Sequence, residues 1–174
     1  LTLHREELQV PLLIRLPEGN DVKTVEENVS LIDIMPTIRD LVGLNKSLMD
    51  EGQSLEPLIF DEPNDLSNRF LFSHLVKKQK EKRLEISSVI YKKWHLITDT
   101  DGKNELYNLH TDRMEKFNKY NDPRSRKLSK KLKYQLRTFR KNCRKYQSET
   151  KRIKISDKEN KRLKTLGYIN VEDK

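Results

Sequence analysis

The chain has 174 residues and a net charge of +9, with 36% charged and 34% hydrophobic residues. This length is enough for a domain with a core, and six prolines and five glycines exclude a collagen-like or low-complexity chain. No apolar run approaches the roughly 20 residues that cross a bilayer, so we expect no membrane span. A single cysteine, Cys143, excludes an internal disulfide and a cysteine metal cluster.

The positive charge is concentrated near the C-terminus. Between Pro123 and Lys164 there are eighteen Lys or Arg residues and three acidic residues, whereas acidic residues outnumber basic ones in the rest of the chain. The sequence has no initiator methionine and begins close to a predicted strand. We therefore expect it to be the C-terminal part of a longer protein.

The N-terminal third predicts half of an α/β unit. A short branched apolar run, Val10–Leu16, has Pro11 at its start and Pro17 just after its end, and it is typical of a buried strand. A dozen residues later, apolar side chains recur on one helical face from residue 31 to residue 42. Ser30 and Asp33 can cap this helix, Gly43 can end it, and Pro36 indicates an irregular first turn.

From Arg69 onward the sequence predicts a small antiparallel sheet. Four aromatic or β-branched segments read as strands: Arg69–Val76, Leu84–Tyr91, Trp94–Thr98 and Glu105–Leu109. Between the last two, Asp99–Asn104 contains an Asp-Gly pair that suits a hairpin turn.

A long helix is expected over Pro123–Gln147, and it supplies a cover for one face of the sheet. Its apolar stripe has helical spacing: Leu128, Leu132, Leu136, Phe139, Cys143 and Tyr146. A second, shorter helix follows, with Ser156 as its cap and Gly167 as its end.

Four segments in sequence resemble the C-terminal part of the sulfatase family of the alkaline phosphatase superfamily. They are TLHREELQVPLLIRLPEG (2–19), VSLIDIMPTIRDLVGL with GQSLEPLI (29–44 and 52–59), YKKWHLITDTDGKNELYNLHTDRMEKFN (91–118) and LKTLGYIN (163–170). The third is similar to the family's ELYDL…D-P-x-E…N element, although Asn108 and Arg113 replace its aspartate and proline.

The resemblance implies a mixed α/β fragment with two parts. Residues 1–60 would be the last strand and helix of a large α/β domain. Residues 69–174 would be a small α+β domain, in which three or four antiparallel strands pack on the long helix.

The resemblance also implies a sulfate ester hydrolase whose chemistry lies upstream of this chain. The family's nucleophile is a formylglycine made from a C/S-x-P-x-R motif, and no such motif occurs here, since Cys143 is followed by Arg-Lys-Tyr. The family's calcium-binding carboxylates also have no counterparts in the sequence. We therefore expect no catalytic residue, no metal ligand and no activity in this chain alone, and an extracytoplasmic or secreted parent enzyme. A phosphatase or phosphotransferase of the same superfamily stays open, because the discriminating nucleophile is outside the chain.

Two histidines are candidates for substrate binding at the pocket rim. His4 is nearest the expected active-site edge, and His74 is at a strand end that the resemblance places near the pocket. For each, a structural histidine is the competing interpretation.

The basic tail supports a second hypothesis, a binding module for nucleic acid or for sulfated or phosphorylated polyanions. Its candidate residues are Lys130, Lys133, Arg137, Arg140, Lys141 and Arg144. No nucleic-acid motif accompanies them, which makes nucleic acid the less favoured partner. A solvated basic face is the competing interpretation, and a polyanionic sulfate ester would make such charge useful for steering.

Overall fold

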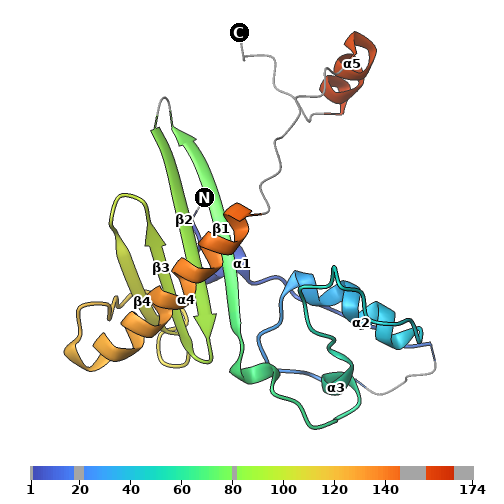
Figure 1. Cartoon of the computed structure of the whole chain (residues 1–174), viewed down its shortest axis with the longest axis horizontal. Helices are drawn as coiled ribbons and strands as arrows, with labels where there is room; N and C mark the ends of the chain where they lie inside the picture. The colour runs from blue at the N-terminus through green and yellow to red at the C-terminus, as the bar shows by residue number, and fades with distance from the viewer. Residues whose placement is uncertain (1, 18–21, 80–81, 146–155, 167–174) are drawn as a thin grey trace. The chain divides into compact units, whose positions relative to one another are not determined.

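The computed structural model describes residues 2–17, 22–79, 82–145 and 156–166 (Figure 1). The chain divides into two units, Leu1–Lys141 and Asn142–Lys174. The division expected from sequence, at residues 60–69, stays a prediction.

The N-terminal third contains short helices joined by extended segments. Helix α1 (Arg5–Leu8) is followed by the 3₁₀ helix η1 (Leu31–Asp33) and by α2 (Ile34–Leu41). The irregular first turn expected before Pro36 is this 3₁₀ helix, and Gly43 has the expected positive φ of 70°. Two further short elements then lead into the sheet, α3 (Glu56–Ile59) and η2 (Leu66–Asn68).

The predicted antiparallel sheet is confirmed. It consists of β1 (Phe70–Gln79), β2 (Lys82–Tyr91), β3 (Trp94–Asp99) and β4 (Asn104–Asn108), in the order β1-β2-β3-β4. In the β3–β4 turn, the Lys103 amide donates to Asp99 Oδ1 at 2.9 Å and Gly102 has a φ of 92°.

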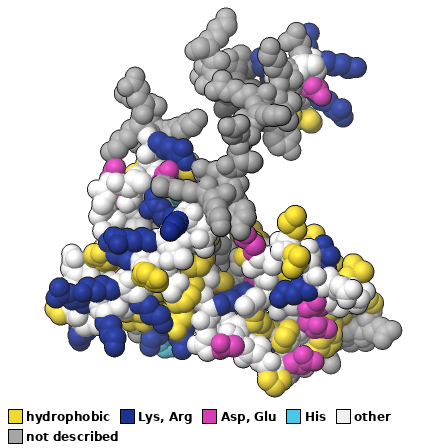
Figure 2. All heavy atoms as spheres, viewed as in Figure 1, with side chains coloured by type: hydrophobic (Ala, Val, Ile, Leu, Met, Phe, Trp, Pro, Cys, Tyr) yellow, Lys and Arg dark blue, Asp and Glu magenta, His cyan; other side chains and the backbone are white. Residues whose placement is uncertain are grey.

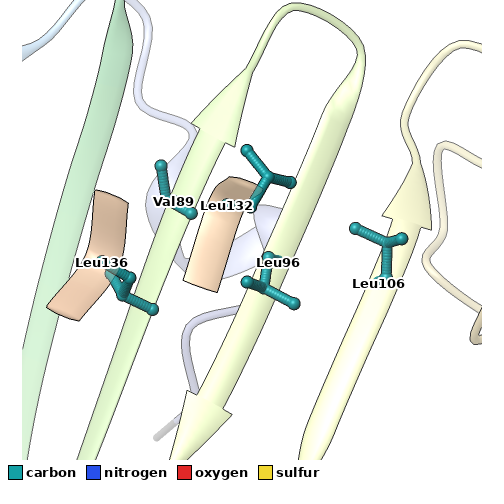
Figure 3. Close-up of a cluster of buried hydrophobic side chains, with 5 residues drawn as sticks. All are labelled: Val89, Leu96, Leu106, Leu132 and Leu136. Atoms are coloured by element: carbon teal, nitrogen blue, oxygen red, sulfur yellow. The ribbon is translucent and has the colours of Figure 1, made fainter. Parts of the chain in front are cut away.

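Helix α4 (Arg126–Lys145) covers one face of the sheet, preceded by η3 (Pro123–Ser125). Val89, Leu96 and Leu106 lie directly opposite one another on β2, β3 and β4, and Leu132 and Leu136 of α4 pack against them (Figure 3). Phe139 extends the contact by stacking on Phe72, with ring centroids 4.4 Å apart.

The apolar stripe of α4 ends at Phe139. Cys143, which the helical spacing placed on the buried side, is exposed, and Tyr146 and Gln147 lie outside the described residues. The spacing gives the helical face correctly, but it does not show which positions on that face are buried.

The second face of the sheet is covered by the N-terminal residues of the chain. Leu3 is buried against Ile97 and Tyr107, with Leu8 and Leu75 at the edge of the cluster. The sheet is therefore packed on both faces, by α4 on one and by residues from the start of the chain on the other.

The expected strand Val10–Leu16 does not form within this chain. Its residues pair with none of the described strands, and Leu13 is 91% exposed. A strand requires a neighbour for its backbone hydrogen bonds, and in the described residues this segment is paired with none of the four strands. The apolar pattern indicates a surface that can be buried, whereas pairing depends on the partner.

In the C-terminal unit, α5 (Asp157–Thr165) has the expected cap. The Ser156 hydroxyl accepts from the Glu159 amide, and the Ser156 amide donates to the Glu159 carboxylate. Gly167, the expected end, lies outside the described residues. Among the described helices, none combines the length and hydropathy required to cross a membrane.

Replacement of Leu132 tests the α4–sheet interface. Leu132 is fully buried, so Leu132→Ala should leave a cavity and lower the free energy of unfolding by about 2–5 kcal/mol. Chemical denaturation measures this change. Tyr134→Ala, on the outward side of the same helix and 68% exposed, is the control and should change stability by less than about 1 kcal/mol. Equal losses in the two variants would contradict the packing described here.

Candidate functional site

A buried carboxylate, Glu115, joins the N-terminal residues to the sheet. One carboxylate oxygen lies 2.5 Å from Nδ1 of His95, which is on the β3 strand. The other oxygen accepts the Arg5 backbone N–H at 2.8 Å and lies 2.9 Å from Nδ1 of His4. We call these four residues the Glu115 clamp.

The loop between β4 and η3 gives Glu115 its position. Asp112 accepts the backbone N–H groups of Lys116 and Phe117, and Asn118 accepts that of Leu106 on β4. Glu115 itself has a φ of 53°, a left-handed conformation that is uncommon outside glycine. The surrounding hydrogen bonds hold this conformation and direct the carboxylate towards His95 and the N-terminal residues.

The clamp favours the ionised form of Glu115. Burial disfavours the carboxylate, but the hydrogen bonds from His95, the Arg5 backbone and His4 outweigh this effect and lower the pKa of Glu115 below its ordinary value. With a side chain only 3% exposed and both oxygens bonded, Glu115 is suited to holding structure rather than to exchanging protons with a substrate.

Glu105 extends the charge network towards solvent. Its carboxylate pairs with Lys103 at 2.8 Å, accepts the Tyr107 hydroxyl at 3.2 Å and lies 3.8 Å from Nε2 of His4. Burial, followed by the Glu105 charge, raises the pKa of Tyr107, so the phenol keeps its proton. His4, with a side chain 25% exposed, is the more accessible histidine of the clamp, because His95 is fully buried.

A second buried carboxylate, Asp33, fixes the loop that connects α2 to the sheet. Arg69, just before β1, donates two hydrogen bonds to it at 2.8 and 2.5 Å. Its oxygens also accept the backbone N–H groups of Ser30 and Gln53. Burial raises the pKa of Asp33, but the Arg69 and backbone hydrogen bonds prevail and lower it.

The same loop requires glycine at position 52. A Cβ placed on Gly52 would lie 2.1 Å from the Ile32 carbonyl oxygen, which is well inside contact distance. The amide of the next residue, Gln53, donates a hydrogen bond to Asp33. The Leu55 amide donates to the Thr37 hydroxyl at 2.9 Å. The residues of the D…PT…G-x-SL pattern are therefore joined to one another by hydrogen bonds. We call this hydrogen-bonded set the Asp33 unit.

Two hollows border this unit. One, of about 230 Å³, lies between Glu26–Asn28 and the start of β1, with Arg69 and Lys92 in its wall. The other, of about 400 Å³, is lined by polar loop residues that include Gln53, Asn64 and Asp65. Within the described residues, neither hollow is lined by a serine, cysteine or threonine beside a histidine, the pairing that nucleophilic catalysis requires.

The two histidines predicted to bind substrate lie on opposite faces of the sheet. His74 shares its face with Phe72 and α4, and its Nδ1 lies 2.9 Å from the Ser87 hydroxyl. His4 contacts Tyr107 on the other face, with ring centroids 5.7 Å apart. The two do not form one site within this unit, and a substrate role for either stays a prediction.

The predicted polyanion-binding residues lie along α4. Lys133 donates to the Tyr120 hydroxyl at 3.0 Å, and Arg140 to Glu85 at 3.1 Å. Lys130, Arg137 and Lys141 are exposed, and the side chain of Arg144 is not among those described. Figure 2 shows Lys and Arg side chains gathered over the surface that α4 provides.

Within the described residues, no group of three His, Cys, Asp or Glu side chains is arranged to hold a metal ion. Calcium, which the resemblance implies for a parent enzyme, has no fitting donor set in this part of the chain. No catalytic step is therefore assigned to a metal here.

Sequence reasoning missed the clamp, although a signal for it existed. The glutamate in the D-P-x-E element is Glu115, and the asparagine that follows it is Asn118. The motif is recognisable in the sequence as a family feature. Its partners His95 and Arg5 are 20 and 110 residues away in sequence, so spacing alone could not identify them.

The family described as "N-sulphoglucosamine sulphohydrolase, C-terminal" matches the chain over residues 2–142. The chain belongs to this family. It is thus a sulfatase C-terminal domain, and the polar residues of its motifs build the clamp and the Asp33 unit. A comparison with curated proteins gave no match.

Solved structures with similar folds include sulfatases and a related hydrolase. A "2-O GAG sulfatase" is 22% identical, with a TM-score of 0.56 over 62% of this chain and 23% of that chain. A protein in complex with its substrate D-glucosamine-2-N,6-O-disulfate is 22% identical, with a TM-score of 0.54 over 68% and 25%. A phosphonate monoester hydrolase from Silicibacter pomeroyi is 21% identical, with a TM-score of 0.59 over 74% and 28%. The chain spans about a quarter of the length of these structures.

Neutralisation of Glu115 tests the clamp. Glu115→Gln removes a buried charge that three donors surround, so the free energy of unfolding should fall by about 3 kcal/mol. Because the pKa of Glu115 is lower in the folded state than in the unfolded state, the wild type should also lose stability as pH falls below about 4.5. The variant should lose less over that range.

Denaturation curves between pH 3 and pH 6 measure both effects. The exposed Glu62→Gln is the matched control and should follow the wild type at every pH. Parallel pH dependence in wild type and Glu115→Gln would show that the clamp does not depend on the carboxylate charge.

Proposed function

We propose that this chain is the C-terminal part of an enzyme that hydrolyses sulfate esters, and that it completes the fold and forms part of the substrate-pocket rim. The observation that carries the proposal is the family match over residues 2–142, together with the Glu115 clamp. The clamp fixes residues 3–8 on a rigid sheet. The resemblance implies that the catalytic side chains lie upstream of this chain, so a fixed segment at residues 3–8 would help to hold them in position.

The exposed apolar residues of the N-terminal third fit a role in a larger domain. Leu13 and Val10 are 91% and 61% exposed, and α2 together with η1 exposes Leu31, Ile32, Met35 and Ile38 by about half or more. Apolar exposure on this scale marks an interaction surface. In the proposed parent, Val10–Leu16 adds a strand to the large sheet and α2 packs on it.

The proposed substrates are sulfated saccharides. The structural neighbours include a GAG sulfatase and a protein bound to a disulfated glucosamine, and these neighbours support the substrate class without identifying the compound. A formylglycine nucleophile, calcium and an extracytoplasmic location belong to the same proposal. The phosphonate monoester hydrolase neighbours keep a phosphoryl ester hydrolase as the second candidate.

Hydrolysis by the full-length native protein tests the proposal. Sulfate, phosphate and phosphonate monoesters of the same nitrophenol should be compared at equal concentration. We expect the sulfate ester to be hydrolysed fastest, and replacement of the Cys or Ser of an upstream C/S-x-P-x-R motif by Ala to abolish turnover. Faster turnover of the phosphorus esters would favour the second candidate, and a parent without that motif would refute hydrolysis by a formylglycine.

The proposed docking of Val10–Leu16 is tested by Leu13→Asp in the full-length protein. Burying a carboxylate against a sheet should lower the free energy of unfolding by several kcal/mol, on the order of 2–4. Leu48→Asp, at a fully exposed leucine in the loop after α2, is the matched control and should change stability by less than about 1 kcal/mol. A Leu13→Asp protein as stable as the control would show that the segment stays exposed.

A further inference from the structure

One side of α4 presents a line of cations to solvent. Arg126, Lys130, Lys133, Arg137 and Lys141 follow one another at spacings of four, three, four and four residues. Residues at such spacings are neighbours on a helix, so these side chains form a row about 22 Å long. We call this set the basic row.

The rest of the molecule neutralises little of this charge. Helix α4 contains no acidic residue, and among its described cations only Arg140, outside the row, pairs with an acidic side chain, Glu85. Lys133 donates to the neutral Tyr120 hydroxyl. The remaining four members of the row are exposed and have no described acidic partner.

This arrangement destabilises the isolated helix. Like charges four residues apart repel, and cations in the first turn oppose the helix dipole, which favours acidic residues there. Apolar packing of Leu132 and Leu136 offsets this cost and holds the row straight. A straight row of unneutralised cations is complementary to a linear polyanion.

We propose that the basic row is a non-catalytic binding surface for a sulfated polysaccharide chain. The proposal rests on the sulfated-saccharide substrate class proposed above, and it assigns that class a second contact, outside the pocket. Arginine and lysine bind sulfate groups by charge-assisted hydrogen bonds, and the guanidinium of Arg137 can do so in a bidentate manner.

The aromatic residues favour a polysaccharide over a nucleic acid. Single-stranded nucleic acid needs exposed rings on which bases stack. Phe139 is stacked on Phe72 in the core, and the rings of Phe70 and Tyr91 lie beneath the Lys131 ammonium. Among the described aromatic residues of α4, Tyr134 alone is exposed beside the row.

Heparin, as the probe, and the full-length native protein provide the test. Binding should weaken as salt rises. Replacing three members of the row by glutamine, at Lys130, Arg137 and Lys141, should lower affinity at least about tenfold near 0.1 M salt and reduce the log–log salt slope by about three. The matched control removes two lysines and one arginine elsewhere, at the exposed Lys46, Lys93 and Arg113. It should lower affinity less than about threefold.

A second measurement excludes misfolding as the cause. Without heparin, the row variant should unfold at the same temperature as the wild type or a higher one, because repulsion is relieved. When heparin is added, the unfolding temperature of the row variant should rise by less than that of the wild type.

Equal heparin affinity for the row variant and the control would overturn the inference. So would tighter binding of a charge-matched single-stranded DNA than of heparin, or binding of inorganic sulfate at the same sulfate concentration with the affinity of heparin. Because binding is measured without turnover, a protein that binds heparin through the row but hydrolyses no sulfate ester would refute the proposed function and leave this surface established.

Discussion

The described unit depends on a carboxylate that the fold has buried and then fully bonded. An ionised glutamate inside a protein is costly unless donors surround it. Glu115 has the imidazoles of His4 and His95 and the Arg5 backbone as donors, and these come from two segments that are far from Glu115 in sequence. The requirement to satisfy one charge thereby joins the N-terminal residues, β3 and the loop after β4. Removing any one segment leaves the others with an unpaired buried group.

The need to satisfy buried charges also explains the polar residues of the family motifs. Asp33 and Glu115 both collect donors from distant segments, and both have lowered pKa values for the same reason. Gly52 and Asn118 serve those loops through close approach and through hydrogen bonds to the backbone. Asp33 and Glu115 are charged residues within motifs, which is also how catalytic residues appear in sequence. Their burial and complete bonding distinguish the two roles, and neither property is visible before folding.

Local signals explain which parts of the fold could be predicted. The four strands, the β3–β4 turn and α4 depend on alternation, an Asp-Gly turn and helical spacing, so the sequence indicates them directly. The Val10–Leu16 strand does not form because pairing needs a neighbour, and the exposure of Cys143 is not predicted because helical spacing does not show how far along the helix the buried stripe extends. The candidate site was less predictable. His4 was identified, but its partners Glu115 and His95 are brought to it by tertiary contacts.

Two exposed surfaces of the chain differ in chemistry, one apolar and one cationic, so they suit different kinds of partner. The apolar residues of Val10–Leu16 and α2 gain free energy by leaving water, so they suit a permanent partner such as another domain of the same protein. The cations of α4 would pay a desolvation cost in a dry interface without acidic groups, and they keep their hydration on the surface. A solvated polyanion satisfies them without burial, through counterion release. The first surface is therefore suited to completing a fold, and the second to a ligand that arrives from solution.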